Sequence, residues 1–220
     1  MKKCIFTIRF GEYDASHEPP KSDGWDYIVF TDQDIESDVW DVRKVVTPLP
    51  NYLAARYVYI NSHRFLDGYD YSLMVGGQIH VIGDLNTFAE QHMDFDADFN
   101  MMKHPCRECI YVEAKQIEKE NIDSSLNFIS QMERYRADGF PENYGLNACG
   151  IIGRHNNGFT ECFEREWWHQ VMTGSYRDQL SFDYVRWKLG GTVHNFGYWE
   201  TLAGDTFSVH QHGTGNRITG

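Results

Sequence analysis

The sequence predicts an α/β fold in which a largely parallel sheet is flanked by helices, and two observations support this prediction. Short apolar runs rich in Ile, Val, Phe and Tyr alternate with longer segments whose apolar residues recur at helical spacing. The apolar runs are bounded by Gly, Pro and Asp, the residues that end strands. Such alternation is typical of sheets whose parallel strands are connected through helices.

The order of the expected elements follows the chain. In the first half we expect strands over 4–10, 26–31 and 39–46, a helix over 53–66, a strand over 72–82 that Gly76-Gly77 splits, and a capped helix from Asp84 to Met93. In the second half we expect two helices within 107–138 separated near 121–125, a strand over 144–154, helices over 159–172 and 178–189, and short strands within 192–198 and 205–212.

Composition restricts the class of protein. The 220 residues are 41% hydrophobic and 15% aromatic, which excludes a disordered chain, and we expect one domain over residues 1–220. Twenty Lys and Arg against 32 Asp and Glu give a net charge of −12, which disfavours general nucleic-acid binding. No apolar run reaches the roughly 18 residues that cross a bilayer, and no signal peptide is evident, so we expect a cytosolic protein.

The five cysteines are an odd number, so reduced thiols are expected rather than a disulfide framework. Cys106 and Cys109 form a CxxC pair with His104 nearby, which raises the alternative of a zinc or thiol-exchange protein. No second CxxC or HxxxH completes a four-ligand set, so this alternative ranks well below the others.

The ends of the first two strands are the expected position of a nucleotide. Phe10, Gly11 and Tyr13 follow the first strand, and the second ends in Thr31 and Asp32. Ligands of open α/β sheets bind beyond the carboxyl ends of the strands, where glycine leaves room for a base or ribose and an aspartate accepts hydrogen bonds. The alternative interpretation is a pair of tight turns.

The segments FGEYD, WDYIVFTD, SHRFLDGYDYSLMVGGQIHVIGD, HPCRECIYVEA, GIIGRHN and RDQLSFDYV appear in this order. Together they resemble the glycosyltransferase-like family of bacteria, their viruses and plants, long described as a domain of unknown function. The resemblance covers about residues 5–190 and is most specific in HPCRECIYVEA and RDQLSF. It implies a Rossmann-like GT-A fold and transfer of a sugar from a nucleotide diphosphate sugar to a hydroxyl acceptor, such as a glycan.

The glycine-split strand departs from the family pattern. The resemblance implies a DxD-like element here, whose first carboxylate holds Mg²⁺ or Mn²⁺ against the donor diphosphate, but Gly76 stands in place of that Asp. Dependence on a divalent metal is therefore open. Gly77 allows close backbone approach, Gln78 offers a polar contact to the donor, and a replacement ligand set is His210 or His212 with Asp84.

Without a metal, the diphosphate needs positive charge from side chains. Arg56 matches the arginine of the family's Arg-x-x-Lys helix, although Tyr59 replaces the lysine. His104 and Arg107, in HPCREC, are further candidates, since a guanidinium binds phosphate through two hydrogen bonds. The alternative for each arginine is a structural ion pair.

RDQLSF contains the candidate catalytic pair, Asp178 and Gln179. The position of Asp178 at the start of a helix predicts an N-cap. The resemblance implies that the pair faces the transferred sugar or the acceptor, with Asp178 as the base of an inverting transfer or with either residue orienting the sugar of a retaining one. The second function, from a different class, is a non-catalytic sugar-nucleotide or glycan-binding module that has lost the metal site.

Overall fold

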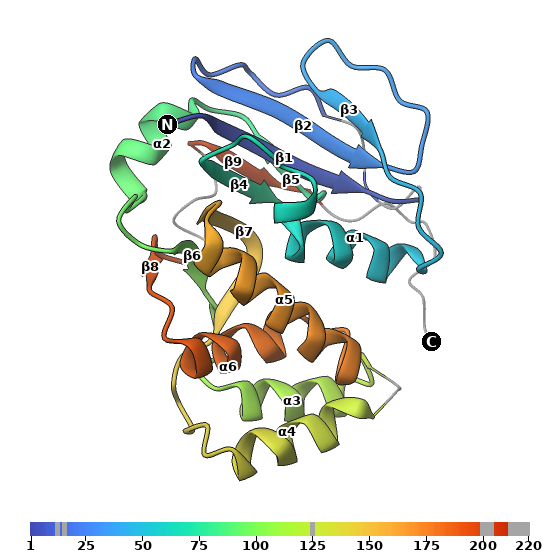
Figure 1. The fold of residues 1–220 in the computed structure, drawn as a ribbon, viewed down its shortest axis with the longest axis vertical. Helices are drawn as coiled ribbons and strands as arrows, with labels where there is room; N and C mark the ends of the chain where they lie inside the picture. Colours follow the sequence, from blue (N-terminus) through green and yellow to red (C-terminus); the bar gives the residue numbers. More distant parts are fainter. Residues whose placement is uncertain (12–13, 15–16, 124–125, 199–204, 211–220) are drawn as a thin grey trace.

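A central sheet of seven strands organises the residues described by the computed structural model, which are 1–11, 14, 17–123, 126–198 and 205–210 (Figure 1). The strand order is β3-β2-β1-β4-β7-β6-β8. The strands are β1 Lys3–Arg9, β2 Trp25–Thr31, β3 Asp41–Lys44, β4 Tyr71–Val75, β6 Phe99–Lys103, β7 Asn147–His155 and β8 Val193–Asn195. A separate two-stranded sheet pairs β5, Ile79–Val81, with β9, Phe207–Val209.

The sheet is mostly parallel, as the sequence predicts. β1 pairs in parallel with β2 and with β4, β2 with β3, and β6 with β8. Only β7 runs against its neighbours, β4 and β6, within the described part of this sheet. The mixed α/β prediction is therefore confirmed, and the fold is Rossmann-like.

Helices cover the sheet because alternate strand residues present apolar side chains to both faces. Figure 1 shows α1, α5, α6, α3 and α4 below the strands β1 to β4. These helices pack on one buried cluster that includes Phe6 and the fully buried Trp167, whereas α2 and the small sheet pack on a second cluster around Leu73. The helices are α1 Asn51–Ile60, α2 Leu85–His92, α3 Ile110–Lys119, α4 Asn127–Ala137, α5 Gly158–Thr173 and α6 Gln179–Leu189, with a 3-10 turn at Ser62–Arg64.

The carboxyl ends of β1, β2 and β4 meet at one edge of the sheet. Arg9 is in register with Thr31, and Thr7 is in register with Val75. Gly11 and Gly76 therefore follow neighbouring strands at the same edge, as predicted. Figure 1 shows the arrowheads of β1, β2 and β3 beside the first residues of α1.

Three element predictions need correction. Gly76-Gly77 does not bend one strand but separates two, because β4 stays in the main sheet while β5 pairs with β9. The helix expected to reach residue 66 ends at Ile60, where the Asn61 side chain donates to the Tyr57 carbonyl over 2.9 Å. The strand β6 was not predicted, since FNMMK has no period-2 alternation and is buried at four of its five residues.

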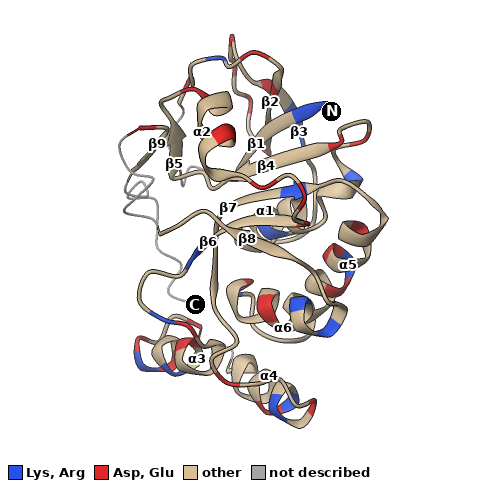
Figure 2. Ribbon diagram, turned by 90° about the vertical axis from the view of Figure 1, so that its left-hand side faces the viewer, with Lys and Arg blue, Asp and Glu red and all other residues tan. Residues whose placement is uncertain are grey.

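Charged residues do not gather into a basic stripe on the face that Figure 2 shows. Lys and Arg alternate there with Asp and Glu along α3, α4 and α5. This arrangement agrees with the net charge of −12 and gives no support to general phosphate binding. Among the described helices, none combines the length and apolarity that crossing a bilayer requires.

Candidate active site

A cavity of about 260 Å³ opens beyond the carboxyl ends of β1, β2 and β3. This is the edge at which open α/β sheets bind their ligands. Its walls combine apolar side chains with a carboxylate, an ammonium group and an amide. The lining residues are Phe10, Asp32, Lys44, Val45, Val46, Thr47, Leu49 and Asn51. The structure thus brings together Phe10 and Asp32, two of the residues predicted to bind the nucleotide.

Gly11 shapes the wall of this cavity. Its φ of +66° lies in the region that favours glycine, and a Cβ there would come within 2.5 Å of Asn51 Nδ2. The amide of Gly11 donates to Asp32 Oδ1 over 2.9 Å, and Gln33 Nε2 donates to the Gly11 carbonyl. Asp32 therefore holds the turn and borders the cavity, so the tight-turn and nucleotide interpretations are compatible.

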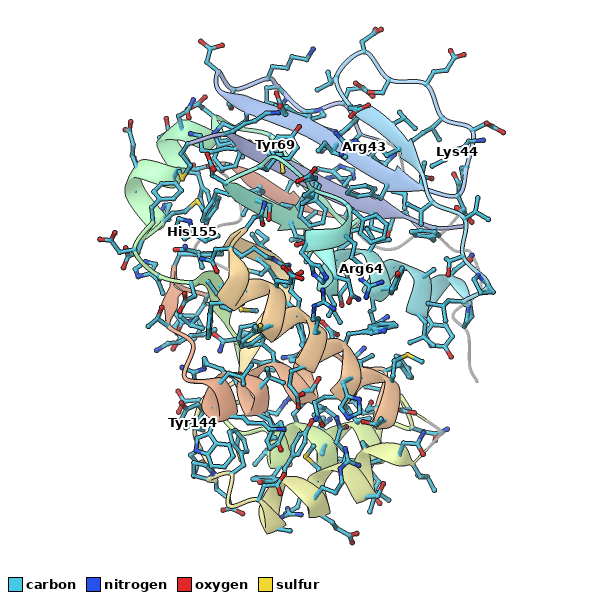
Figure 3. The ribbon with its side chains drawn as sticks, in the orientation of Figure 1. Arg43, Lys44, Arg64, Tyr69, Tyr144 and His155 are labelled. Carbon is cyan, nitrogen blue, oxygen red and sulfur yellow. The ribbon has the colours of Figure 1, made fainter. Side chains whose placement is uncertain are left out.

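The outer rim of the cavity carries a positive charge. Lys44 ends β3 and lies at the periphery of the molecule, as Figure 3 shows. Its ammonium group forms an ion pair with the exposed Asp34. An exposed pair of this kind contributes at most about 1 kcal/mol, so Lys44 can exchange Asp34 for an anionic ligand at small cost.

A second group of polar side chains lies between α1 and α6. Arg56, on α1, forms an ion pair with Asp178, which directly precedes α6, and Arg56 Nε lies 3.6 Å from Asp178 Oδ1. The two side chains are 18% and 10% exposed. Arg56 Nη1 donates to the Tyr52 carbonyl over 2.7 Å, and the guanidinium lies 5.2 Å from the centre of the Tyr176 ring. Arg56 and Asp178, which were predicted as separate site residues, are therefore in contact.

Tyr59 and Cys149 border the same carboxylate. Tyr59 lies one helical turn after Arg56 on α1, and Cys149 lies on β7. Burial, and after it the neighbouring charge of Asp178, raises the pKa of Tyr59 and that of the Cys149 thiol well above their ordinary values. Both groups are therefore neutral hydrogen-bond donors at physiological pH. Asp178 is therefore surrounded by one cation, Arg56, and two neutral donors, Tyr59 and Cys149.

Asp178 is not the N-cap that its position predicts. The residue has helical φ and ψ of −51° and −34°, and its side chain accepts no capping hydrogen bond. An N-cap needs extended backbone, from which the side chain can reach the amides of the first turn. The Asp178 carbonyl accepts from Trp167 Nε1 over 3.0 Å instead. The carboxylate is thus buried without a structural role in α6, which favours a functional one.

The segment after β6 places His104 and Arg107 together. Arg107 Nη2 lies 3.3 Å from His104 Nε2, and Arg107 Nε donates to Glu113 Oε2. Glu113 lies on α3 and is only 4% exposed. Burial lowers the pKa of His104, against the opposing charge of Glu113, so His104 is neutral at physiological pH. This geometry favours the structural ion-pair alternative for Arg107.

The turn that separates β4 from β5 contains Gly76, Gly77 and Gln78. The Gly76 amide donates to the Gly150 carbonyl over 2.8 Å, which joins the turn to β7. The carboxylate of Asp14 lies against the α-carbon of Gly77, where any side chain would clash with it. A side chain at position 77 would have to displace the Asp14 carboxylate, so glycine suits this close approach.

Three histidine rings stack beside this turn. His80 stacks on His17 at 4.4 Å and on His210 at 3.9 Å between ring centres. The amide of His210 donates to the Gln78 carbonyl over 2.9 Å. Burial, with the neighbouring His17 and His210, lowers the pKa of His80 to about 4, so this ring is neutral at physiological pH. The stack joins the small sheet to the loop after β1.

Among the described residues, this edge does not gather the ligands of the divalent-cation site implied by the family resemblance. Gly76 offers no carboxylate, and Asp84 accepts from the Thr87 amide over 2.8 Å as the N-cap of α2, as predicted. Within the described ranges, no group of three His, Cys, Asp or Glu side chains is arranged to hold a metal. Tyr13 and His212 lie outside the described residues.

Sequence reasoning missed four residues of the candidate site. Tyr59 and Cys149 border Asp178, Asn51 lines the cavity, and Arg177 directly precedes Asp178. Helical spacing from Arg56 identifies the face that carries Tyr59. The sequence did not indicate that Cys149 belongs to the site, because β7 and α1 come together only in the folded protein. Gln179 begins α6, half-buried, next to Asp178.

Comparison with known proteins identifies the family. A family model described as TOD1/MUCI70, glycosyltransferase-like domain, matches residues 40–207. A search of curated proteins finds no match. The matched region covers about three quarters of the chain and includes α1, the glycine turn, β7 and α6. The chain therefore belongs to the TOD1/MUCI70 glycosyltransferase-like domain family.

Proposed function

We propose that the protein transfers a sugar from a nucleotide diphosphate sugar to a hydroxyl acceptor. The observation that supports this most strongly is the distance along α1 between the two polar regions. Asn51 lines the cavity and Arg56 contacts Asp178, and five residues of helix span about 7.5 Å. A nucleoside in the cavity would therefore direct its diphosphate along α1 toward Arg56 and its sugar toward Asp178.

Asp178 is the proposed general base. Its Oδ2 atom is buried and has no hydrogen-bond partner within the protein. In a direct displacement, Asp178 takes the proton of the acceptor hydroxyl as that oxygen attacks the anomeric carbon of the donor. The bond from this carbon to the diphosphate oxygen breaks, and the diphosphate leaves with the electron pair. A positioned base of this kind contributes roughly 10²- to 10⁴-fold to the rate.

Arg56 is the proposed electrostatic partner of the leaving group. In the donor-free protein its guanidinium contacts Asp178 at 3.6 Å, beyond the range of a hydrogen bond. A phosphate oxygen can therefore replace this contact with a shorter, charge-assisted hydrogen bond. The replacement would also leave the Asp178 carboxylate available to the acceptor proton. Gln179, whose Nε2 is buried without a partner, would donate to a hydroxyl of the transferred sugar.

The test is release of nucleoside diphosphate from a panel of nucleotide diphosphate sugars, with simple sugars as acceptors. We expect Asp178→Asn to lower turnover by about 10²-fold or more with donor affinity unchanged, because the amide keeps the shape but cannot take a proton. The matched control is Asp41→Asn, which removes an exposed carboxylate paired with Arg43 and should leave turnover unchanged.

The second candidate is a non-catalytic module that binds a nucleotide sugar or a glycan. The replacement of the expected carboxylate by Gly76 favours it, since catalytic relatives of this fold use that group to hold a metal. Donor binding without release of nucleoside diphosphate, in the presence of every acceptor tried, would favour this module over the transferase.

A further inference from the structure

Four buried polar atoms at the α1–α6 junction have no hydrogen-bond partner within the protein. Three are donors, Nε of Arg56, Nε of Arg177 and Nε2 of Gln179, and the fourth is the acceptor Oδ2 of Asp178. A buried polar group without a partner is unfavourable, and native proteins retain few of them. Four such atoms on adjacent side chains therefore indicate a site built to receive a polar ligand.

Arg177 has no carboxylate within ion-pair distance in the part of the chain that the structure describes. Its backbone is fixed, because its amide donates to Ser175 Oγ over 3.0 Å and that hydroxyl donates to Asp123 over 2.6 Å. Its charge also acts on His104. Burial lowers the pKa of His104, and the charges of Arg107 and Arg177 lower it further. Arg177 is therefore a cation without an ion-pair partner among the described residues, near enough to His104 to act on its pKa.

Arg107 offers a contrast three residues from the same histidine. Its Nε donates to the buried Glu113, so its charge is already matched. Removing Arg107 from Glu113 would leave a buried carboxylate unpaired, which is strongly unfavourable. Of these two arginines, Arg177 is the one that can bind an incoming anion without such a loss.

We propose that Arg177 and Arg56 bind the donor diphosphate directly, so that donor binding requires no divalent cation. This inference rests on the proposed function, and it names the group that replaces the metal. Each phosphate of a nucleotide diphosphate sugar carries a negative charge, and two guanidinium groups match them with geometry suited to phosphate. Gln179 adds a neutral donor at the same helix end, where the N-terminus of α6 favours an anion.

The side chains near Gly76 support a cation-free site. A metal clamp offsets diphosphate charge through hard oxygen ligands, and position 76 provides none. Two carboxylates near the proposed diphosphate are Asp178, which contacts Arg56, and Glu113, which contacts Arg107. Both carboxylates are thus paired with arginine rather than grouped for a cation.

The experiment is titration calorimetry of the full chain with uridine, guanosine, adenosine and cytidine diphosphates, in EDTA and again in Mn²⁺. We expect one of these probes to bind with the same Kd in both buffers. Arg177→Ala should weaken binding about 10- to 150-fold, and Arg177→Lys less, because lysine keeps the charge but not the paired donors. Arg165→Ala, which removes an exposed arginine of α5, is the control and should leave Kd unchanged.

The outcomes separate this inference from the proposed function. Binding that appears only with Mn²⁺, or a Kd that Arg177→Ala leaves unchanged in a variant with normal thermal unfolding, overturns the inference while the transferase remains. Absence of binding in both buffers overturns both. Metal-free binding that depends on Arg177, in a protein whose Asp178→Asn variant keeps full turnover, supports the inference and contradicts the proposed base.

Discussion

Two buried arginine–carboxylate pairs differ in how completely their carboxylates are hydrogen-bonded. In both pairs the arginine keeps buried nitrogens without a partner, Nε and Nη2 of Arg154 and Nε of Arg56. In the pair between β7 and α5, Arg154 Nη1 donates to Glu164 Oε1 over 2.7 Å, and the side chains are 0% and 2% exposed. Glu164 also accepts from Ser62 Oγ over 2.7 Å and from the His63 amide over 3.0 Å. In the pair between α1 and α6, Arg56 and Asp178 are 3.6 Å apart and Asp178 Oδ2 has no partner.

The difference distinguishes a pair that fixes the fold from the pair proposed to act in glycosyl transfer. The two oxygens of Glu164 accept from Ser62, His63 and Arg154, so this pair fixes α5 and the 3-10 turn at Ser62–Arg64 against the sheet. A buried pair stabilises a fold only when the remaining lone pairs are also satisfied. Asp178 interacts instead with Arg56, Tyr59 and Cys149, and its Oδ2 has no hydrogen-bond partner. Mutations should therefore affect stability at one pair and ligand chemistry at the other.

The largest expected effect on stability is that of Glu164→Gln. The substitution leaves the Arg154 guanidinium buried without a counter-charge, and breaking such a pair costs about 3–5 kcal/mol. For a chain of this size that corresponds to a fall in Tm of roughly 6–20 °C. Calorimetric unfolding measures it directly. A Tm within about 2 °C of the wild type would show that the network does not fix the fold.

Asp178→Asn should destabilise the protein less than Glu164→Gln does, because its ion pair is longer, at 3.6 Å against 2.7 Å, and less buried. Arg56 also keeps its contacts with the Tyr52 carbonyl and the Tyr176 ring, and the asparagine fills the same volume. The same unfolding experiment makes the comparison. If Asp178→Asn destabilises the protein as much as Glu164→Gln does, the two pairs contribute equally to the stability of the fold, and the distinction between them fails.

Low pH should destabilise the fold through protonation of Glu164. Although burial opposes it, hydrogen bonding from His63 and the charge of Arg154 lower the pKa of Glu164 below its ordinary value of 4.5. A lowered folded-state pKa stabilises the fold above the unfolded-state value, and this stability disappears as pH falls through the folded-state pKa. Unfolding free energies measured from pH 6 to pH 3 should show this loss, and the loss should be smaller in Glu164→Gln.

The smallest expected effect is on the reactivity of Cys149. Burial and the charge of Asp178 raise the pKa of this thiol, so it should react with a thiol reagent far more slowly than the exposed Cys106 and Cys162. Asp178→Asn removes one of the two causes and should accelerate modification of Cys149 alone, as peptide mapping would show. An unchanged rate in this variant would place Asp178 too far away to act on the thiol.

The sequence predicted the parts of the fold that depend on local pattern. Apolar runs and helical spacing located β1, β2, β7, α5 and α6, and glycine marked the turn after β4. The predictions that failed depend on tertiary contacts. The register of β5 is set by β9, which lies far along the chain.

In the candidate site, too, the sequence predicted what depends on local pattern and missed what depends on tertiary contacts. Position beyond a strand end correctly associated Phe10 and Asp32, and the family resemblance identified Arg56 and Asp178 without showing that they meet. The sequence did not single out Arg177 as a binding residue. Whether an arginine has an ion-pair partner becomes known only when the structure places its neighbours. The N-cap prediction for Asp178 failed because backbone angles before a helix are not fixed by residue type alone.

The central claim is that the Arg56–Asp178 pair serves glycosyl transfer and not the fold. The most direct test measures nucleoside diphosphate release and Tm together for the wild type, Asp178→Asn and Glu164→Gln. The account predicts that Asp178→Asn loses about 10²-fold or more in turnover with a smaller fall in Tm than Glu164→Gln, whereas Glu164→Gln keeps turnover at temperatures where it is folded. Full turnover in Asp178→Asn would contradict it.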